Sequence, residues 1–172
     1  MTDYTNITAA QAQQAMPQLC ALLQACIADG ASVGFTDPFD EETITRFWRQ
    51  RIDDLAQNRC HFLVARQNGV IIATVLLNYN AIPNGRHRAE IAKLLVHPHA
   101  RRQGIARQLM QRVEQQARLA GLSLLVLDTR SGDVASKLYL SLGWQVAGAI
   151  PSYAESPAGT LDATTIMYKH LD

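Results

Sequence analysis

One stretch near the middle of the chain decides the fold, and it reads Lys93-Leu94-Leu95-Val96-His97-Pro98-His99-Ala100-Arg101-Arg102-Gln103-Gly104-Ile105-Ala106-Arg107. Its apolar beginning is typical of a strand, and the basic turn that follows opens directly onto an amphipathic helix. A helix N-terminus has about four unpaired N–H donors and about half a positive charge, so it attracts anions. Gly104 lets a ligand approach the backbone. The stretch therefore predicts a pyrophosphate cradle with three arginines around it: Arg101, Arg102 and Arg107.

Length and charge limit the class of protein. The 172 residues fit a single domain, 1–172, that can bury a core without metal or disulfide bonds. With 16 basic and 15 acidic residues, the net charge of +1 lacks the positive field of nucleic-acid-binding proteins. No apolar run approaches the roughly 20 residues of a membrane span, and the N-terminus does not resemble a signal peptide. We expect a cytoplasmic protein that binds neither nucleic acid nor membrane.

The cysteines and histidines favour neither disulfides nor a metal site. Cys20, Cys26 and Cys60 are an odd number without C-x-x-C spacing, which is typical of reduced thiols in a cytosolic core. His97 and His99 have a spacing found in some metal sites, but no cysteine or carboxylate cluster accompanies them. We therefore expect no bound metal.

Apolar periodicity predicts two helices before the first clear strand. Two sets of apolar residues have helical spacing; the first is Leu19, Leu22, Leu23, Cys26 and Ile27, and the second is Ile44, Phe47, Trp48, Ile52 and Leu55. Between them, residues 30–38 form an irregular loop of small residues, and Gly30 marks the end of the first helix.

A mixed sheet is expected from the rest of the chain. The turn at Gln67-Asn68-Gly69 joins 61–65 and 70–79 as an antiparallel hairpin, and a strand over 90–96 follows the turn at 83–85. After the helix that ends at Gly121, residues 124–127 are apolar on both faces, as in a central parallel strand covered by helices. A short helix and two closing strands complete an α/β fold, mostly antiparallel with one central parallel pair and about four helices. The only long irregular segment is 151–160.

Two motifs together resemble the GCN5-related N-acetyltransferase (GNAT) superfamily. Arg101-x-x-Gly104-x-Ala106 is similar to the acetyl-CoA signature Gln/Arg-x-x-Gly-x-Gly/Ala. A later segment matches the second cofactor-contacting helix of that family at Ala135, Leu138, Tyr139, Gly143 and Trp144. The family often has an asparagine seven positions before the tyrosine, where this chain has Gly132.

The resemblance is closer to one branch, the tabtoxin-resistance acetyltransferases, which modify a β-lactam amino acid. It is carried by the segments 30–35, 83–85, 88–90, 127–129 and 150–153, and by the ending at Tyr168. This likeness implies a toxin-resistance function and an amino-acid-like acceptor. In this fold the acceptor side is implied to contain Ser32, Gly34, Phe35, Tyr153 and Asp162.

The family resemblance also implies the cofactor and its contacts. Acetyl-CoA is the implied cosubstrate, and its pantetheine arm lies beside the strand at 91–96 like an added strand. A backbone N–H near Leu95 or Val96 is then expected to polarise the thioester. The implied cofactor-binding residues are Leu94, Leu95, Val96, Arg101, Arg102, Gln103, Gly104, Ile105, Ala106, Arg107, Ser136 and Tyr139.

Three residues are candidates for the acid–base chemistry of acetyl transfer to an amine. Tyr139 is the candidate general acid, since a phenol with an ordinary pKa of about 10 keeps its proton at neutral pH. Glu90 is the candidate base, and the alternative is a structural ion pair with Arg88. Asp128, at the end of an apolar strand, is a second acidic candidate, with capping of the following loop as its alternative.

These inferences predict an acetyl-CoA-dependent N-acetyltransferase that acts on a small amine. No cysteine lies in an evident nucleophile context apart from Cys60, which precedes His61, so direct transfer in a ternary complex is favoured over an acyl-enzyme. A protein or peptide acetyltransferase and a non-catalytic acetyl-CoA sensor stay open as alternatives. A homodimer also stays open.

Overall fold

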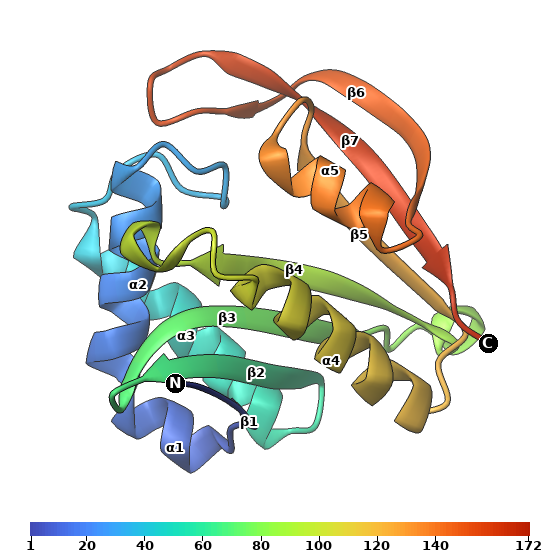
Figure 1. The fold of residues 1–172 in the computed structure, drawn as a ribbon, viewed down its shortest axis with the longest axis horizontal. Helices are drawn as coiled ribbons and strands as arrows, with labels where there is room; N and C mark the ends of the chain where they lie inside the picture. Colours follow the sequence, from blue (N-terminus) through green and yellow to red (C-terminus); the bar gives the residue numbers. More distant parts are fainter.

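The computed structural model describes residues 1–172, in which five α-helices pack against one seven-stranded sheet (Figure 1). The first half of the chain contains β1 (Thr2–Asn6), α1 (Ala9–Gln14), α2 (Met16–Ala28), α3 (Glu41–Ala56), β2 (Cys60–Gln67), β3 (Val70–Tyr79) and the 3₁₀ turn η1 (Pro83–Gly85). The second half contains β4 (Arg88–Val96), the 3₁₀ turn η2 (Pro98–Ala100), α4 (Ile105–Leu119), β5 (Leu124–Arg130), α5 (Val134–Ser141), β6 (Gln145–Glu155) and β7 (Leu161–His170).

The strand order of the sheet confirms the predicted fold class. The order is β1-β2-β3-β4-β5-β7-β6, and only the central pair β4–β5 is parallel. The hairpin between β2 and β3 turns at Asn68 and Gly69, both with positive φ, as a tight two-residue hairpin turn requires. The crossover from β4 through α4 to β5 is the predicted strand–helix–strand unit.

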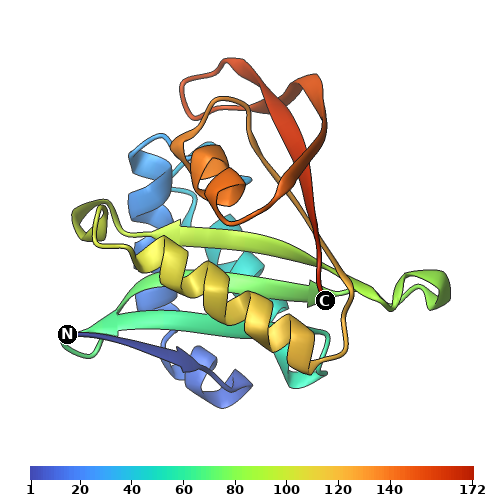
Figure 2. The same cartoon turned by 45° about the vertical axis from the view of Figure 1, so that its right-hand side comes forward.

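Two hydrophobic clusters hold the helices on opposite faces of the first four strands (Figures 1 and 2). On one face, α1, α2 and α3 pack through Leu19, Trp48 and Phe62, and the rings of Trp48 and Phe62 stack at 5.6 Å. On the other face, α4 packs through Leu109 and Val113. Every buried residue of α2 and α3 is one of the apolar positions predicted from helical spacing, whereas the predicted positions Phe47 and Leu55 are half-buried.

The second half of the sheet is covered on one face only, which corrects one prediction. Leu125 and Leu127 are buried in the core with α4 and α5, whereas Leu124 and Val126 on the opposite face are half-buried. Almost every residue of β6 is exposed. The apolar run 124–127 therefore does not have helices on both faces, because α2 and α3 pack over β2 to β4 and do not extend over β5.

Three local features differ from the prediction. Residues 151–155 continue β6, so that only the turn at 156–160 separates it from β7 and 151–160 is not one irregular segment. The chain also begins with a strand, β1, and with a separate helix, α1, that were not predicted. A sequence signal for α1 exists, because Thr8 and Gln11 form a capping box. No helix has the length and apolar character needed to cross a membrane.

Candidate active site

The two parallel strands separate near the middle of β4 and leave one of its edges open. Pairing of β4 with β5 extends only from Arg88–Leu124 to Glu90–Val126. Beyond this point β5 pairs with β7, and Figure 1 shows β4 and β5 diverging. Residues 91–96 therefore form an open edge of β4, where no strand of the chain takes up their backbone groups on that side. Such an edge can accept an extended ligand as an added strand.

A β-bulge at Lys93 sets which side chains share a face at this edge. Lys93 has a positive φ of 51°, and the register between β3 and β4 shifts here, with Thr74 opposite Leu95 and Leu76 opposite Ala92. The hydroxyl of Thr74 donates a hydrogen bond of 2.9 Å to the Lys93 carbonyl oxygen and holds the bulge. The extra residue interrupts the two-residue alternation, so Glu90 and Lys93 both lie on the face that α3 covers.

The N-terminus of α4 has the features of an anion cradle. Gly104 is the N-cap residue with a positive φ of 76°, and no side chain caps the first turn. A Cβ atom at Gly104 would meet nothing within 4 Å, so the space above the turn is open. The N–H groups of Ile105, Ala106 and Arg107 belong to the first turn of α4, where backbone N–H groups have no partner within the helix. An uncapped helix N-terminus of this kind can bind an anion, and the sequence analysis predicted a pyrophosphate cradle at this position.

Most polar side chains of this loop already have protein partners. Arg101 forms a salt bridge with Asp29 at the end of α2, and Gln103 accepts a hydrogen bond from Gln67. Arg107 donates to the Ser141 hydroxyl at 2.9 Å and so connects α4 with α5. Of the three predicted arginines, only Arg102 has no side-chain partner, and its φ is also positive, at 61°. The three arginines place positive charge near the cradle; Arg101 also holds the loop against the end of α2, and Arg107 also connects α4 with α5.

Tyr139 lies on α5 with its ring in the core and its hydroxyl unpaired. The residue is 6% exposed and its ring lies 6.1 Å from that of Trp144, while its hydroxyl forms no hydrogen bond within the protein. Burial, with the charges of Asp128 and Asp133, raises the pKa of Tyr139 to about 12. The phenol therefore keeps its proton at neutral pH. Ser136, one turn before Tyr139, donates its hydroxyl to the Asp133 carbonyl oxygen.

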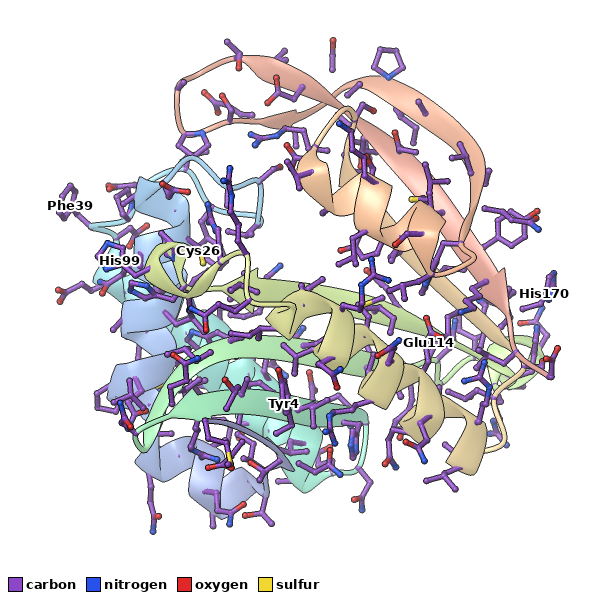
Figure 3. The ribbon with its side chains drawn as sticks, viewed as in Figure 1. Tyr4, Cys26, Phe39, His99, Glu114 and His170 are labelled. Carbon is purple, nitrogen blue, oxygen red and sulfur yellow. The ribbon has the colours of Figure 1, made fainter.

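The tryptophan after Gly143 is held in place by a buried carboxylate. Glu114 on α4, labelled in Figure 3, accepts hydrogen bonds from the Trp144 indole at 3.1 Å and from Lys169 at 2.8 Å. Lys169 on β7 also donates to the Leu142 carbonyl oxygen. This contact fixes the end of α5 against α4 and β7, and it was not predicted. The only feature of the sequence that could have indicated this contact is the position of Glu114, which follows Val113 on the buried side of α4.

Glu90, Asp128 and Lys93 form a cluster of charges beside the separation of the strands. Partial loss of hydration and the charge of Asp128 raise the pKa of Glu90, and Lys93 opposes this shift. Burial lowers the pKa of Lys93, against the charges of Asp128 and Glu90. Lys93 Nζ lies 5.1 Å from the centre of the Phe47 ring and forms no ion pair. The charge of Asp128 therefore acts on both Glu90 and Lys93, and these two groups also act on each other.

Two sequence-based interpretations of these acids are wrong. Glu90 forms no salt bridge with Arg88, so the alternative of a structural ion pair does not apply. Asp128 does not end its strand, because β5 continues to Arg130 by pairing with β7. Asp128 is exposed, and its carboxylate accepts a hydrogen bond of 3.1 Å from Thr164 on β7 rather than capping the following loop.

The predicted acceptor-side residues lie on two parts of the chain, here called the two walls of the acceptor side. The first wall is the loop after α2, the second is formed by β6 and β7, and Arg130 contacts both. In the first wall Phe35 packs edge-on against Phe47, and a Cβ on Gly34 would lie 3.6 Å from Lys93 Nζ. In the second wall Tyr153 is exposed on β6. Ser32 is half-buried in the loop after α2, and Asp162 on β7 faces Arg130.

Arg130 is a residue of this region that the sequence did not reveal. It donates to the Gly30 carbonyl oxygen and to Asp133, both at 3.0 Å, and lies 3.7 Å from Asp162. It thereby connects the loop after α2 with the second half of the sheet.

The cysteines are poorly suited to a covalent role. Burial raises the pKa of Cys26 and of Cys60 to about 11, and it also raises the pKa of Cys20. All three thiols are free, and the Cys26 thiol on α2 (Figure 3) donates weakly to the Val96 carbonyl oxygen. At neutral pH the reactive thiolate is therefore scarce. No group of three or more metal-binding side chains gathers in the structure, and the His97 and His99 rings pack edge-on at 5.2 Å.

A mixed sheet that opens between two parallel strands, an uncapped helix at the opening and charged groups beside it are the features expected of the acyl-CoA N-acyltransferase class. The sequence model described as "Acetyltransferase (GNAT) family" matches residues 21–144, and the chain belongs to this family. It is an acetyl-CoA-dependent N-acetyltransferase of the GNAT type.

One relative is similar to this chain in sequence, and two solved structures are similar to it in fold. The chain is 33% identical over 107 residues to the IAA acetyltransferase of Azospirillum brasilense, which covers 62% of this chain and 68% of the relative. The fold of the present chain is similar to that of yncA from Salmonella typhimurium, whose structure contains its cofactor acetyl-CoA. The TM-score is 0.80 at 21% identity, and the match covers 100% of this chain and 95% of yncA. An N-acetyltransferase from Staphylococcus aureus Mu50 gives a TM-score of 0.83 at 18% identity and covers 100% and 99%.

Proposed function

We propose that this enzyme transfers an acetyl group from acetyl-CoA to a small amine by direct transfer in a ternary complex. The observation that carries the proposal is the position of Asp128, whose charge acts on both Glu90 and Tyr139. The candidate base and the candidate acid therefore both lie near one carboxylate, at the place where β4 and β5 separate. Acetyl transfer to an amine needs a base that takes a proton from the amine and an acid that gives one to the leaving thiolate.

The residues that would hold acetyl-CoA are those of the cradle and the open edge. The N–H groups of the first turn of α4 would bind the pyrophosphate, and the backbone at Leu94, Leu95 and Val96 would bind the pantetheine arm. Acetyl-CoA supplies a thioester whose carbonyl carbon is open to attack by an amine. A backbone N–H near Leu95 or Val96 would orient the carbonyl oxygen.

Glu90 and Tyr139 move the protons. An acceptor amine is mostly protonated at neutral pH, and a carboxylate of Glu90 takes one proton from it, directly or through water. The raised pKa of Glu90 makes it a stronger base than an ordinary glutamate. Tyr139 holds its proton on Oη until a thiolate needs it, since its pKa of about 12 prevents earlier loss.

The acceptor that we favour is small, and an amino-acid-like toxin such as a β-lactam amino acid is the most specific candidate. The contacts of Arg130 with Gly30, Asp133 and Asp162 support this choice, because they join the two walls of the acceptor side and restrict an extended peptide. A peptide acetyltransferase would need an open groove along both walls.

The test is CoA thiol release from acetyl-CoA with the purified enzyme across a panel of amines. The panel contains β-lactam amino acids, amino acids, polyamines, aminoglycosides and a lysine peptide. We expect release with one class of small amine, and loss of release in Glu90→Gln that is greatest at low pH, where free amine is scarce. Efficient acetylation of the peptide alone would contradict the proposal. Tight acetyl-CoA binding without release by any amine would favour a sensor.

A further inference from the structure

A polar pocket beside Glu90 has an arginine that no acidic group neutralises. The pocket has a volume of about 390 Å³ and lies at the start of β4, between β3 and β5. The polar residues that line it are Asn78, Tyr79, Asn80, Arg88 and Glu90. Arg88 is half-buried and forms neither a salt bridge nor a side-chain hydrogen bond. A half-buried guanidinium without a partner loses hydration and gains nothing in return within the protein.

The fold gives this arginine a defined place. Arg88 and Glu90 are two residues apart on β4, so their side chains lie on the same face and both reach the pocket. Gly85 in η1 is buried, and a Cβ atom there would come within 2.7 Å of the Arg88 guanidinium. The glycine therefore leaves the space in which the guanidinium lies.

Opposite charges are thus separated along one wall of the pocket. Glu90 and Arg88 both line the pocket and lie two residues apart on β4, and the negative charge of Asp128 is near Glu90. An ammonium group is attracted to the acidic end, where the proposed base removes its proton, and a carboxylate is attracted to the arginine. Guanidinium binds carboxylate through two parallel hydrogen bonds, which makes this contact selective as well as strong.

We infer that the acceptor is an amino acid with a free carboxylate, and that Arg88 is the specificity-determining residue that binds this carboxylate while Glu90 faces the amine. The inference rests on the proposed function and names its substrate class. The amide groups of Asn78 and Asn80 supply further hydrogen bonds for the acceptor. An uncharged amine or the N-terminus of a peptide lacks a carboxylate at this position.

The test compares each acceptor acid with its own carboxamide. Steady-state kinetics are measured for L-amino acids, β-lactam amino acids and the matching carboxamides, in wild type and in Arg88→Gln. We expect Arg88→Gln to raise KM for the acid about 10- to 100-fold, to change kcat much less, and to leave KM for the carboxamide within about threefold. The ratio of KM for the acid to KM for the carboxamide is compared between the two enzymes. The intrinsic difference in reactivity between acid and carboxamide is the same in both enzymes, so it cancels in this comparison.

Three variants separate binding from folding. Arg86→Gln removes the same charge from an exposed neighbour outside the pocket and should change neither KM. Arg88→Lys keeps the charge and should recover part of the acid preference. Gly85→Ala keeps Arg88 but displaces its guanidinium, so KM for the acid should rise by less than in Arg88→Gln.

Equal losses for acid and carboxamide in Arg88→Gln, or unchanged kinetics in both Arg88→Gln and Gly85→Ala, would overturn the inference while leaving the proposed acetyl transfer intact. Wild-type enzyme that binds acetyl-CoA but acetylates no amine would overturn the proposed function as well.

Discussion

The Arg130 guanidinium donates a hydrogen bond of 3.0 Å to the backbone carbonyl oxygen of Gly30 and so joins the end of β5 to the loop after α2. The same side chain pairs with Asp133 and faces Asp162. These contacts connect segments far apart in the sequence across the acceptor side. The position of the loop 30–38 therefore depends on a residue of the second half of the chain.

Arg130→Gln is expected to raise the acceptor KM while the Kd of acetyl-CoA stays unchanged, because the loop after α2 loses its connection to β5. The free energy of unfolding should fall by about 1 kcal/mol. Steady-state kinetics measure the acceptor KM, and calorimetry measures the Kd of acetyl-CoA and the stability. Arg118→Gln, at an exposed position late in α4, is the control. An unchanged acceptor KM would show that the loop is held without Arg130.

Gly104→Glu is expected to abolish acetyl-CoA binding in calorimetry, since a carboxylate would occupy the space above the first turn of α4. Gly121 offers a matched control, because it follows the same helix with the same φ of 76° and equally open surroundings. Both substitutions impose the strain of a left-handed residue, about 1 kcal/mol. Only Gly104→Glu should lose the cofactor, and similar affinities in the two variants would contradict the cradle.

Tyr139→Phe is expected to lower kcat about 100-fold with little change in acetyl-CoA affinity. The Tyr139 hydroxyl forms no hydrogen bond within the protein, so its removal should leave Tm nearly unchanged and the loss can be assigned to chemistry. Tyr168→Phe removes a hydroxyl that donates to Gln145 on β6 and should retain full activity. A wild-type rate in Tyr139→Phe would make this tyrosine structural.

Asp128→Asn and Lys93→Met are expected to move the pH profile in opposite directions. Asp128 raises the pKa of Glu90 and Lys93 lowers it. Removing the aspartate charge should therefore shift the acidic limb of kcat/KM to lower pH, and removing the lysine charge should shift it to higher pH. Asparagine can still accept the hydrogen bond from Thr164. If neither variant moved the limb, Glu90 would not be the titrating base.

Local sequence patterns predicted much of the fold. Asn68-Gly69 gave the hairpin, because few other residues tolerate the positive φ of its turn, and helical spacing identified the buried residues of α2 and α3. The strand β1 and the full length of β6 were missed. Both have weak apolar alternation, and their strand structure depends on pairing with β2 and β7.

The sequence by itself determined the loop at 101–107 and the helix after it, because glycine at the N-cap and helical periodicity act over a few residues. It also placed Tyr139 on a short helix. The tertiary structure alone decided the bulge at Lys93, which depends on the register between β3 and β4, and the separation of β4 from β5. It alone brought Arg130 to Gly30, and Glu90 and Arg88 to one pocket, because these relationships arise from how distant strands pack and not from local conformational preference.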